Sequence, residues 1–257
     1  MSPSLGILYQ DYLPAQLKPI LAANNVGKTV LVQASNCVAE SRWLLELADN
    51  NDFIAGVVGW VDLKSDEVDR QLAELTHYPK FKGVRHLVES EPDDDWLIQP
   101  DVLHGLNRLA AFDVSYDLLV HTRHLKHVPI VADSCPELSL VIDHMAKPPI
   151  KTSEMTEWLS EMKNVAAIPK VRCKLSGLVT EANWESWKVD DLRPYVDVAL
   201  ELFGPERMMF GSDHPVCLLA ASYKRVLDAF QEILKGLSEN ERELIFAINA
   251  SNFYRLN

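Results

Sequence analysis

Ionisable side chains follow five successive apolar runs of the chain, each at or near the carboxyl end of its run. In barrels of parallel strands these positions carry the catalytic groups, because the loops after the strands form the binding face. Asp213 could take a proton from water as a general base, and His144 could polarise a carbonyl group or hold that water. Such a set suits hydrolysis at an activated carbonyl, and it suits decarboxylation of an acid equally well. The residues concerned are Arg85, His86, His121, Arg123, Asp143, His144, Lys174, Ser176 and Asp213.

Each of these residues, taken singly, has a plainer interpretation. A lone histidine at a strand end is usually a hydrogen-bonded structural residue, and Lys174 could extend its ammonium group to solvent. The segment 211–213 could be only a turn that caps the next helix. Five coincidences at the same end of successive runs nevertheless favour a site. The side chains that could grip an anionic or hydroxyl-rich substrate are Arg85, His86, His121 and Arg123.

Seven β-rich apolar runs must position these groups, and stretches with helical periodicity separate most of them. The spacing of the runs is that of βα units, and their near-continuous apolar character indicates parallel pairing. The predicted strands are 28–33, 54–61, 81–88, 114–121, 138–144, 171–176 and 207–212. The predicted helices are 16–25, 39–50, 65–77, 100–111, 153–164, 190–203 and most of the remainder to about residue 254.

Two architectures fit this alternation, a doubly wound open sheet and a (β/α)8 barrel of the TIM type. The chain contains no G-x-G-x-x-G and no G-x-x-x-x-G-K-[ST] segment, so both usual nucleotide signatures of the open sheet are absent. We therefore expect one domain over residues 1–257, an incomplete TIM barrel in which seven strands are visible. The first strand of the barrel is expected to be missing, because it would have to precede Ser4.

Composition limits the partners and the compartment. The formal net charge of −12 argues against nucleic acid or an anionic membrane as the main partner, since both require basic patches. No apolar stretch approaches the roughly 20 residues of a membrane span, and the first residues do not form a signal peptide. We therefore expect a cytoplasmic protein with reduced, mostly buried thiols and a small-molecule substrate. The four cysteines are Cys37, Cys135, Cys173 and Cys217, and the sequence leaves the oligomeric state open.

Several longer segments, in order along the chain, carry a family resemblance. They are 59–62 (GWVD), 83–93 (GVRHLVESEPD), 143–149 (DHMAKPP), 173–182 (CKLSGLVTEA), 209–217 (MFGSDHPVC) and 251–256 (SNFYRL). Together they resemble the amidohydrolase-related family of the amidohydrolase superfamily, and more narrowly its sugar-lactonase branch of L-fuconolactone and L-rhamnonolactone hydrolases. The resemblance spans essentially the whole chain.

This resemblance implies a (β/α)8 barrel that hydrolyses a lactone to its aldonic acid. Asp213 would be the acid/base residue on the last strand, and His144 would be the histidine of the sixth strand, counting the missing one as first. The residues expected around the substrate are Trp60, Arg85, His86, His121, Arg123, Lys174 and His214.

The chain departs from the family pattern in two places. The first strand of the family carries His-x-His, whereas no histidine precedes His77 here. A chain that starts late, or a shortened and inactive protein, would account for this. The position after Asp213 is usually Trp in this branch, and here it is His214. Zinc needs three or four ligands, so His144 and Asp213 are possible ligands only. A divalent metal such as zinc and a metal-independent reaction both remain open.

Two alternatives to the lactonase stay open. The first is a decarboxylase of the same superfamily, which would release carbon dioxide rather than a new acid. The second is an inactive remnant, whose open barrel would expose two strand edges and associate. Away from the strand ends, the acidic run 93–95 is expected to be a solvated loop. Trp96, Trp184 and Trp187 are expected to cover the core beneath loops.

Overall fold

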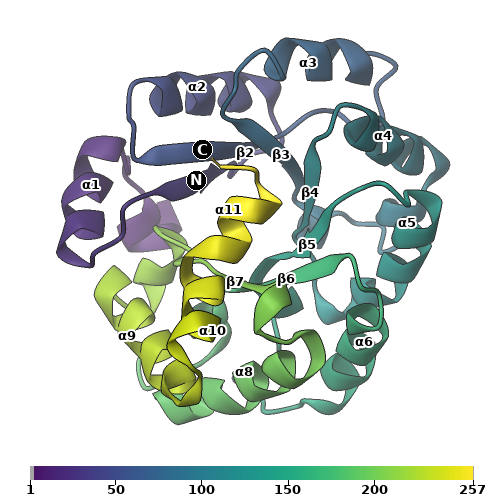
Figure 1. The fold of residues 1–257 in the computed structure, drawn as a ribbon. Helices are drawn as coiled ribbons and strands as arrows, with labels where there is room; N and C mark the ends of the chain where they lie inside the picture. Colours follow the sequence, from purple (N-terminus) through teal and green to yellow (C-terminus); the bar gives the residue numbers. More distant parts are fainter. Residues whose placement is uncertain (1–2, 257) are drawn as a thin grey trace.

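Seven parallel strands curl about a common axis and form the inner layer of the molecule, a TIM-barrel-like α/β fold, in a computed structural model that describes residues 3–256 (Figure 1). Each strand pairs with its neighbours in the chain, so the described sheet runs in the order β1 to β7. The strand expected before Ser4 lies outside the described residues. The strands are β1 Thr29–Val32, β2 Ile54–Gly59, β3 Phe81–His86, β4 Ser115–Leu118, β5 Leu140–Ile142, β6 Val171–Leu175 and β7 Met208–Phe210.

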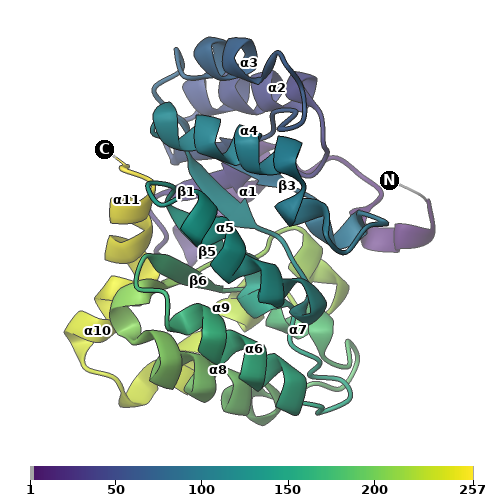
Figure 2. The same ribbon diagram turned by 90° about the vertical axis from the view of Figure 1, so that its right-hand side faces the viewer.

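Most of the helices form an outer layer around the sheet (Figures 1 and 2). The helices are α1 Pro14–Ala23, α2 Val38–Asp49, α3 Val68–Leu75, α4 Pro100–Ala111, α5 Val128–Ser134, α6 Thr156–Ala166, α7 Leu178–Glu181, α8 Val189–Phe203, α9 Tyr223–Ile233, α10 Glu239–Glu243 and α11 Asn249–Phe253, with the π-helical turn η9 Leu244–Ile248 between the last two. Short 3-10 helices are η1 Pro3–Leu8, η2 Val88–Ser90, η3 Trp96–Ile98, η4 Thr122–His127, η5 Asp143–Ala146, η6 Pro205–Arg207, η7 Val216–Leu219 and η8 Leu234–Gly236. No helix among these is both long and apolar enough to cross a bilayer.

All seven predicted strands are present, and the strand ends differ most from the prediction. The fourth strand was predicted as 114–121, but β4 stops at Leu118 and the chain then turns into the loop that carries His121. The sequence also predicted no helix between the fourth and fifth strands, where η4 and α5 lie. The seven residues of α5, with a proline at its start, are too few for a helical period to stand out.

The core has two parts. The larger part lies between the sheet and the helices, and in α2 it takes in Leu44, Leu45 and Ala48. The smaller part fills the inside of the sheet, where Val58, Val141 and Met209 pack against Phe253 and Tyr254 of the C-terminal segment. Figure 1 shows α11 lying across the ring of strands. The C-terminal segment therefore closes the barrel at the end opposite the strand-end loops.

The thiols follow the prediction from the sequence. All four cysteines are free, Cys37 is exposed, and the other three are buried. Burial raises the pKa of Cys217 to about 12, so this thiol, four residues from Asp213, stays protonated.

Candidate active site

His144 stands at the start of a left-handed turn that follows β5. The backbone φ angle is 53° at His144 and 53° at Met145, a region that L-residues seldom occupy. The Lys147 N–H donates to the His144 carbonyl at 2.8 Å. The buried indole Nε1–H of Trp158 donates to the Met145 carbonyl at 2.7 Å. The strained turn is thus held by hydrogen bonds from within the loop and from α6, as expected at a functional site.

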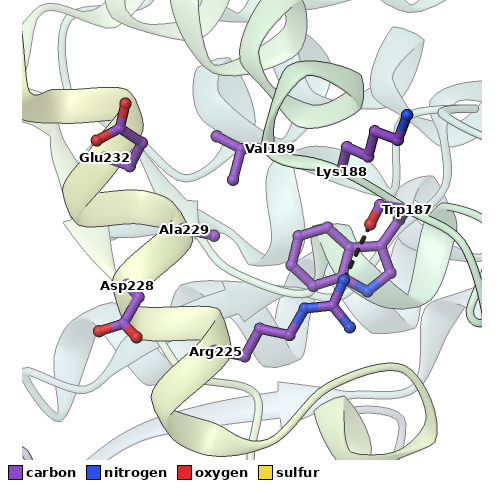
Figure 3. Close-up of a pocket in the computed structure, with 7 residues that line it drawn as sticks. All are labelled: Trp187, Lys188, Val189, Arg225, Asp228, Ala229 and Glu232. Atoms are coloured by element: carbon purple, nitrogen blue, oxygen red, sulfur yellow. Dashed lines mark hydrogen bonds between the residues drawn. The ribbon is translucent and has the colours of Figure 1, made fainter.

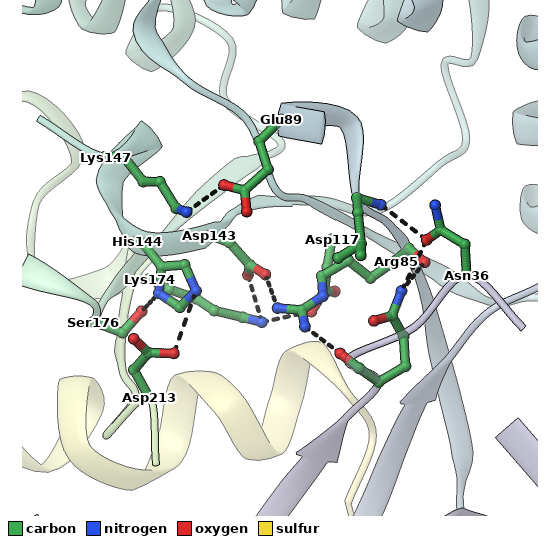
Figure 4. A network of polar contacts seen from close by, with 12 residues as sticks. Asn36, Arg85, Glu89, Asp117, Asp143, His144, Lys147, Lys174, Ser176 and Asp213 are labelled. Atoms are coloured by element: carbon green, nitrogen blue, oxygen red, sulfur yellow. Dashed lines mark hydrogen bonds and ion pairs between the residues drawn. The ribbon is translucent and has the colours of Figure 1, made fainter. Parts of the chain in front are cut away.

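The His144 imidazole lies between a serine of β6's exit loop and an aspartate of β7's exit loop (Figure 4). Its Nδ1 is 2.8 Å from Ser176 Oγ, and its Nε2 is 3.7 Å from Asp213 Oδ1. Gly177, with a φ of 70°, lies against the ring, and a Cβ there would be 2.6 Å from His144 Cγ. The sequence predicted His144 and Asp213 as the catalytic pair, and the structure brings the two side chains together.

The protonation of His144 is set by its surroundings. Burial lowers the pKa of His144, and the carboxylates of Asp213 and Asp143 oppose this shift only in part. The imidazole is therefore neutral near pH 7. A neutral imidazole offers one N–H donor and one acceptor, which suits it to hold a water molecule or a carbonyl oxygen.

A network of four charged side chains lies inside the barrel below His144 (Figure 4). Lys174 Nζ is 2.5 Å from Asp117 Oδ2 and 2.7 Å from Asp143 Oδ1, and Arg85 Nη1 is 2.9 Å from Asp143 Oδ2. Both aspartates are fully buried. The interpretation that Lys174 extends to solvent is therefore wrong, because its ammonium group is gripped by two buried carboxylates.

Opposing effects set the charges of this network. Burial alone would raise the pKa of Asp143, but Lys174 and Arg85 outweigh it and hold that pKa below its ordinary value. Burial likewise would lower the pKa of Lys174, yet Asp117 and Asp143 raise it well above the ordinary value. Burial raises the pKa of Asp117, and Lys174 offsets part of that shift. Lys174 is consequently charged throughout the physiological range.

The two arginines that could grip an anionic substrate both have protein partners. Arg85 is bound to Asp143 and also donates from Nη2 to the Gln33 carbonyl, and its side chain is 12% exposed. Arg123 lies in η4, where its Nε is 2.7 Å from Asp94 Oδ1. The run 93–95, predicted to be a solvated loop, is exposed but is tied to η4, since His127 Nε2 is also 2.9 Å from Asp95 Oδ1.

Trp60 and His86 form one wall of the strand-end face. The Trp60 Nε1–H donates to His86 Nδ1 at 3.0 Å, and His86 Nε2 is 2.7 Å from Glu91 Oε1. The ring of Trp96 stacks on His86 with centroids 3.9 Å apart. Burial lowers the pKa of His86. Trp96 is buried as predicted, and so is Trp187, whereas Trp184 is 47% exposed.

The loops that surround His144 and Asp213 bring to the mouth three ionisable residues that were not predicted, Glu89, Lys147 and Glu181. Lys147 Nζ is paired with Glu89 Oε2 (Figure 4). His121 Nε2 lies 4.0 Å from the same oxygen. Burial raises the pKa of Glu181, and Glu89 and Asp213 add to that shift while Lys147 opposes it. The sequence did not single out Glu89, Lys147 or Glu181. Glu89 lies in η2, Lys147 directly after η5 and Glu181 in α7, all segments too short to show periodicity. Each belongs to a family-like segment quoted above, and only that resemblance could have pointed to it.

His214 faces the N-terminal arm rather than the charged network. Its ring meets Tyr12 edge to face with centroids 5.5 Å apart, and its backbone N–H donates to Ser212 Oγ at 3.3 Å. Burial lowers the pKa of His214. Asp213 itself has a φ of 56°, so the chain turns sharply where the carboxylate enters the site.

The described residues do not supply a complete zinc site. His144 Nε2 and Asp213 Oδ1 are close enough to bind one ion together. Within residues 3–256, however, no three side chains of His, Cys, Asp or Glu converge on one point. Two donors are fewer than the three protein ligands that a catalytic zinc ion requires. The reaction steps below are therefore assigned to side chains alone.

A hollow of about 360 Å³ lies on the outer layer, away from these residues (Figure 3). The Arg225 guanidinium lies 4.1 Å from the centroid of the Trp187 ring and donates to the Trp187 carbonyl at 3.0 Å. None of the site residues predicted from the sequence lines this hollow. The guanidinium group of Arg225 is engaged with Trp187. The lining residues are Trp187, Lys188, Val189, Arg225, Asp228, Ala229 and Glu232.

Comparisons with known proteins show what the chain is similar to. A family model described as Amidohydrolase matches residues 1–256. An L-fucono-1,5-lactonase of Burkholderia ambifaria is 38% identical over 98% of this chain and 88% of its own length. A second L-fucono-1,5-lactonase, of Burkholderia multivorans, is also 38% identical, again over 98% of this chain and 88% of its own length.

A solved structure matches the fold closely. The crystal structure of an amidohydrolase from Burkholderia multivorans with bound zinc superposes with a TM-score of 0.95 and 37% sequence identity. The match covers 100% of this chain and 93% of that chain. The barrel described above is therefore the fold of that enzyme.

Proposed function

The chain belongs to the amidohydrolase family, and on that premise we propose that it hydrolyses a sugar lactone of the L-fucono-1,5-lactone type to its aldonic acid. The observation that carries the proposal is the meeting of His144 and Asp213 at the carboxyl ends of β5 and β7. The names and the 38% identity of the two Burkholderia relatives support the choice of a lactone.

In the proposed reaction, water is the nucleophile. Asp213 accepts a proton from the water as its oxygen bonds to the lactone carbonyl carbon. The Nε2–H of His144 donates to the carbonyl oxygen while negative charge develops there. The bond from that carbon to the ring oxygen then breaks, and Asp213 returns its proton to the ring oxygen. The product is the open hydroxy acid, and Asp213 is ready for the next turnover.

Ser176 is assigned to position His144 rather than to attack the substrate. A serine, a histidine and an aspartate in contact resemble the nucleophilic triad of serine hydrolases. Ser176 is only 1% exposed, however, and its hydroxyl contacts Nδ1 of the imidazole, whereas a nucleophile contacts Nε2. When the Ser176 hydroxyl donates to Nδ1, the ring proton stays on Nε2, which is the tautomer that the reaction uses.

The charges at the mouth favour a neutral, hydroxyl-rich substrate. Arg85 and Arg123 pair with aspartates, and Lys147 pairs with Glu89. An anionic substrate would have to displace one of these carboxylates. Carboxylates such as Glu89 and Glu181 accept hydrogen bonds from sugar hydroxyls without such a displacement.

The substrate class is tested by acid release from a panel of aldonolactones, followed with a pH indicator and corrected for spontaneous opening. We expect the highest kcat/KM with L-fucono-1,5-lactone or a lactone that differs from it at one hydroxyl. In parallel, the protein is incubated with aromatic and unsaturated acids as substrates, and the release of carbon dioxide is measured. Release of carbon dioxide without any lactone opening would contradict the proposal and favour the decarboxylase.

A further inference from the structure

The C-terminal segment contacts the charged network of Arg85, Asp117, Asp143 and Lys174 from the end of the barrel opposite the strand-end loops. Tyr254 lies in the floor of the barrel among Val58, Val141 and Met209, and it is 2% exposed. A tyrosine hydroxyl in such apolar surroundings is costly unless it forms a hydrogen bond. The Tyr254 hydroxyl donates to Asp117 Oδ2 at 2.8 Å, across 137 positions of sequence.

From this hydroxyl a continuous series of contacts runs up to the catalytic histidine. Asp117 Oδ2 also accepts from Lys174 Nζ at 2.5 Å, and Lys174 Nζ lies 2.7 Å from Asp143 Oδ1 (Figure 4). Asp143 is bonded through the main chain to His144, where the left-handed turn begins. Lys174 Nζ also lies 5.6 Å from the centroid of the Tyr254 ring. The floor and the mouth of the barrel are thus joined through three buried charges.

We propose that Tyr254 is a positioning residue of the active site, whose hydroxyl fixes Asp117 so that Lys174 is shared between Asp117 and Asp143 below His144. The role of Tyr254 in lactone turnover rests on the proposed function, whereas the contact with Asp117 does not. The groups that face Asp117 are Lys174 on β6, Asp143 directly after β5 and Tyr254 from the C-terminal segment.

The hydroxyl also favours the ionised form of Asp117. Burial raises the pKa of Asp117, while Lys174 and the Tyr254 hydrogen bond each lower it. Removing the hydroxyl therefore moves the pKa of Asp117 further upward. When Asp117 takes up a proton, Lys174 loses one of its two carboxylate partners and can shift toward Asp143.

A matched pair of tyrosine variants tests the proposal. Tyr254→Phe removes the hydroxyl and keeps the ring. Tyr116→Phe makes the same change at the residue next to Asp117, where the buried hydroxyl has no hydrogen-bond partner among the described residues. For Tyr254→Phe we expect kcat on the best lactone to fall roughly tenfold with KM within about twofold, the effect of one lost hydrogen bond to a charged group. The acid limb of its pH–rate profile moves to higher pH, and Tyr116→Phe leaves both unchanged.

A measurement without substrate separates this proposal from the proposed function. With carboxyl-13C aspartate, one aspartate signal should titrate at higher pH in Tyr254→Phe than in wild type, and at an unchanged pH in Tyr116→Phe. If wild type opens no lactone, the proposed function fails while this titration still tests the contact. An unchanged titration in Tyr254→Phe, or an equal change in Tyr116→Phe, would overturn the proposal. The proposal would also be overturned if Tyr254→Phe lowered the thermal midpoint but left kcat and the pH–rate profile as in wild type.

Discussion

The His144 imidazole is held from several directions by single residues with separate tasks. Ser176 contacts Nδ1, Asp213 faces Nε2, and Trp158 supports the left-handed turn from below. Gly177 supplies space, since its φ of 70° and the 2.6 Å between a Cβ there and His144 Cγ leave no room for a side chain. The position of the ring is therefore set both by the side chains that contact it and by the absence of a side chain at Gly177.

The first prediction concerns the space that Gly177 leaves for the His144 ring. Gly177→Ala would push a methyl group into the His144 ring, so we expect kcat/KM to fall by roughly 10²-fold, as for small displacements of a catalytic group. The matched control is Gly236→Ala in η8, where an added Cβ meets no atom within 4 Å. Lactone hydrolysis is assayed for both variants, and circular dichroism reports whether they fold. Equal activity of the two variants would show that the ring position does not matter.

At this scale the sequence predicted part of the candidate site and missed the rest for a physical reason. His144 and Asp213 directly follow apolar strands, so their place at the mouth could be read from local pattern. Contacts such as Glu89 with Lys147 join loops that follow different strands. The loops have no periodicity to reveal the direction of a side chain, so those contacts had to come from the folded chain.

At the scale of elements, the exit ends of β3 to β6 are tied together by charge as well as by backbone hydrogen bonds. Arg85 belongs to β3, Asp117 to β4 and Lys174 to β6, while Asp143 follows β5. The two aspartates are fully buried, the side chains of Arg85 and Lys174 are each 12% exposed, and each ion has a partner of opposite sign on a different element. Removing one ion leaves a buried charge without compensation, which costs more than the intact pair contributes.

This arrangement predicts the effect of removing Lys174. Lys174→Met would leave Asp117 without its cation and Asp143 with Arg85 alone, so we expect the free energy of unfolding to fall by about 3–5 kcal/mol. Lys163→Met, at an exposed position in the last turn of α6, should change it by no more than about 0.5 kcal/mol. Urea unfolding followed by tryptophan fluorescence compares the two. A loss below about 1 kcal/mol for Lys174→Met would contradict the interpretation of the network.

The elements themselves were largely predictable. The spacing of apolar runs gave the strands in their correct order, and the helix 100–111 was predicted with the bounds of α4. The predicted strands ran past their ends, because apolar residues such as Leu119 and Val120 continue into the buried part of the exit loop. Pattern alone does not distinguish a buried loop residue from a strand residue.

At the scale of the whole molecule, burial of histidines makes stability depend on pH. Burial lowers the pKa of His86 and of His144 relative to the ordinary value. The unfolded chain therefore takes up protons near pH 6.5, where the folded chain does not. Their contribution to stability is complete above about pH 6.5 and is lost as the pH falls below it. The lowered pKa of Asp143 acts in the same direction at still lower pH, and the raised pKa of Asp117 opposes it.

We accordingly expect the thermal midpoint to be lower at pH 5.5 than at pH 7.5 by roughly 3–8 °C. Differential scanning calorimetry at constant ionic strength measures the difference. His86→Gln should reduce the dependence on pH, because one of the imidazoles whose pKa is lowered by burial is then absent. An unchanged or higher midpoint at pH 5.5 would show that these histidines do not control the acid side of the stability profile.

The whole molecule also shows why one role stayed hidden in the sequence. The segment 251–256 was noticed only for its family resemblance, yet its Tyr254 reaches Asp117 through the floor of the barrel. Closure of the floor by the C-terminal segment depends on how the sheet curls, which no local pattern encodes. The general fold could therefore be predicted, and this contact could not.

The central claim is that Asp213 activates water for lactone hydrolysis. Its most direct test is the initial rate of acid release from L-fucono-1,5-lactone by wild type and by Asp213→Asn, at one pH and with spontaneous opening subtracted. We predict that wild type releases acid and that the variant is slower by roughly 10²–10⁴-fold, the usual contribution of a general base, with an unchanged circular dichroism spectrum. A folded Asp213→Asn variant with a rate within tenfold of wild type would contradict the claim.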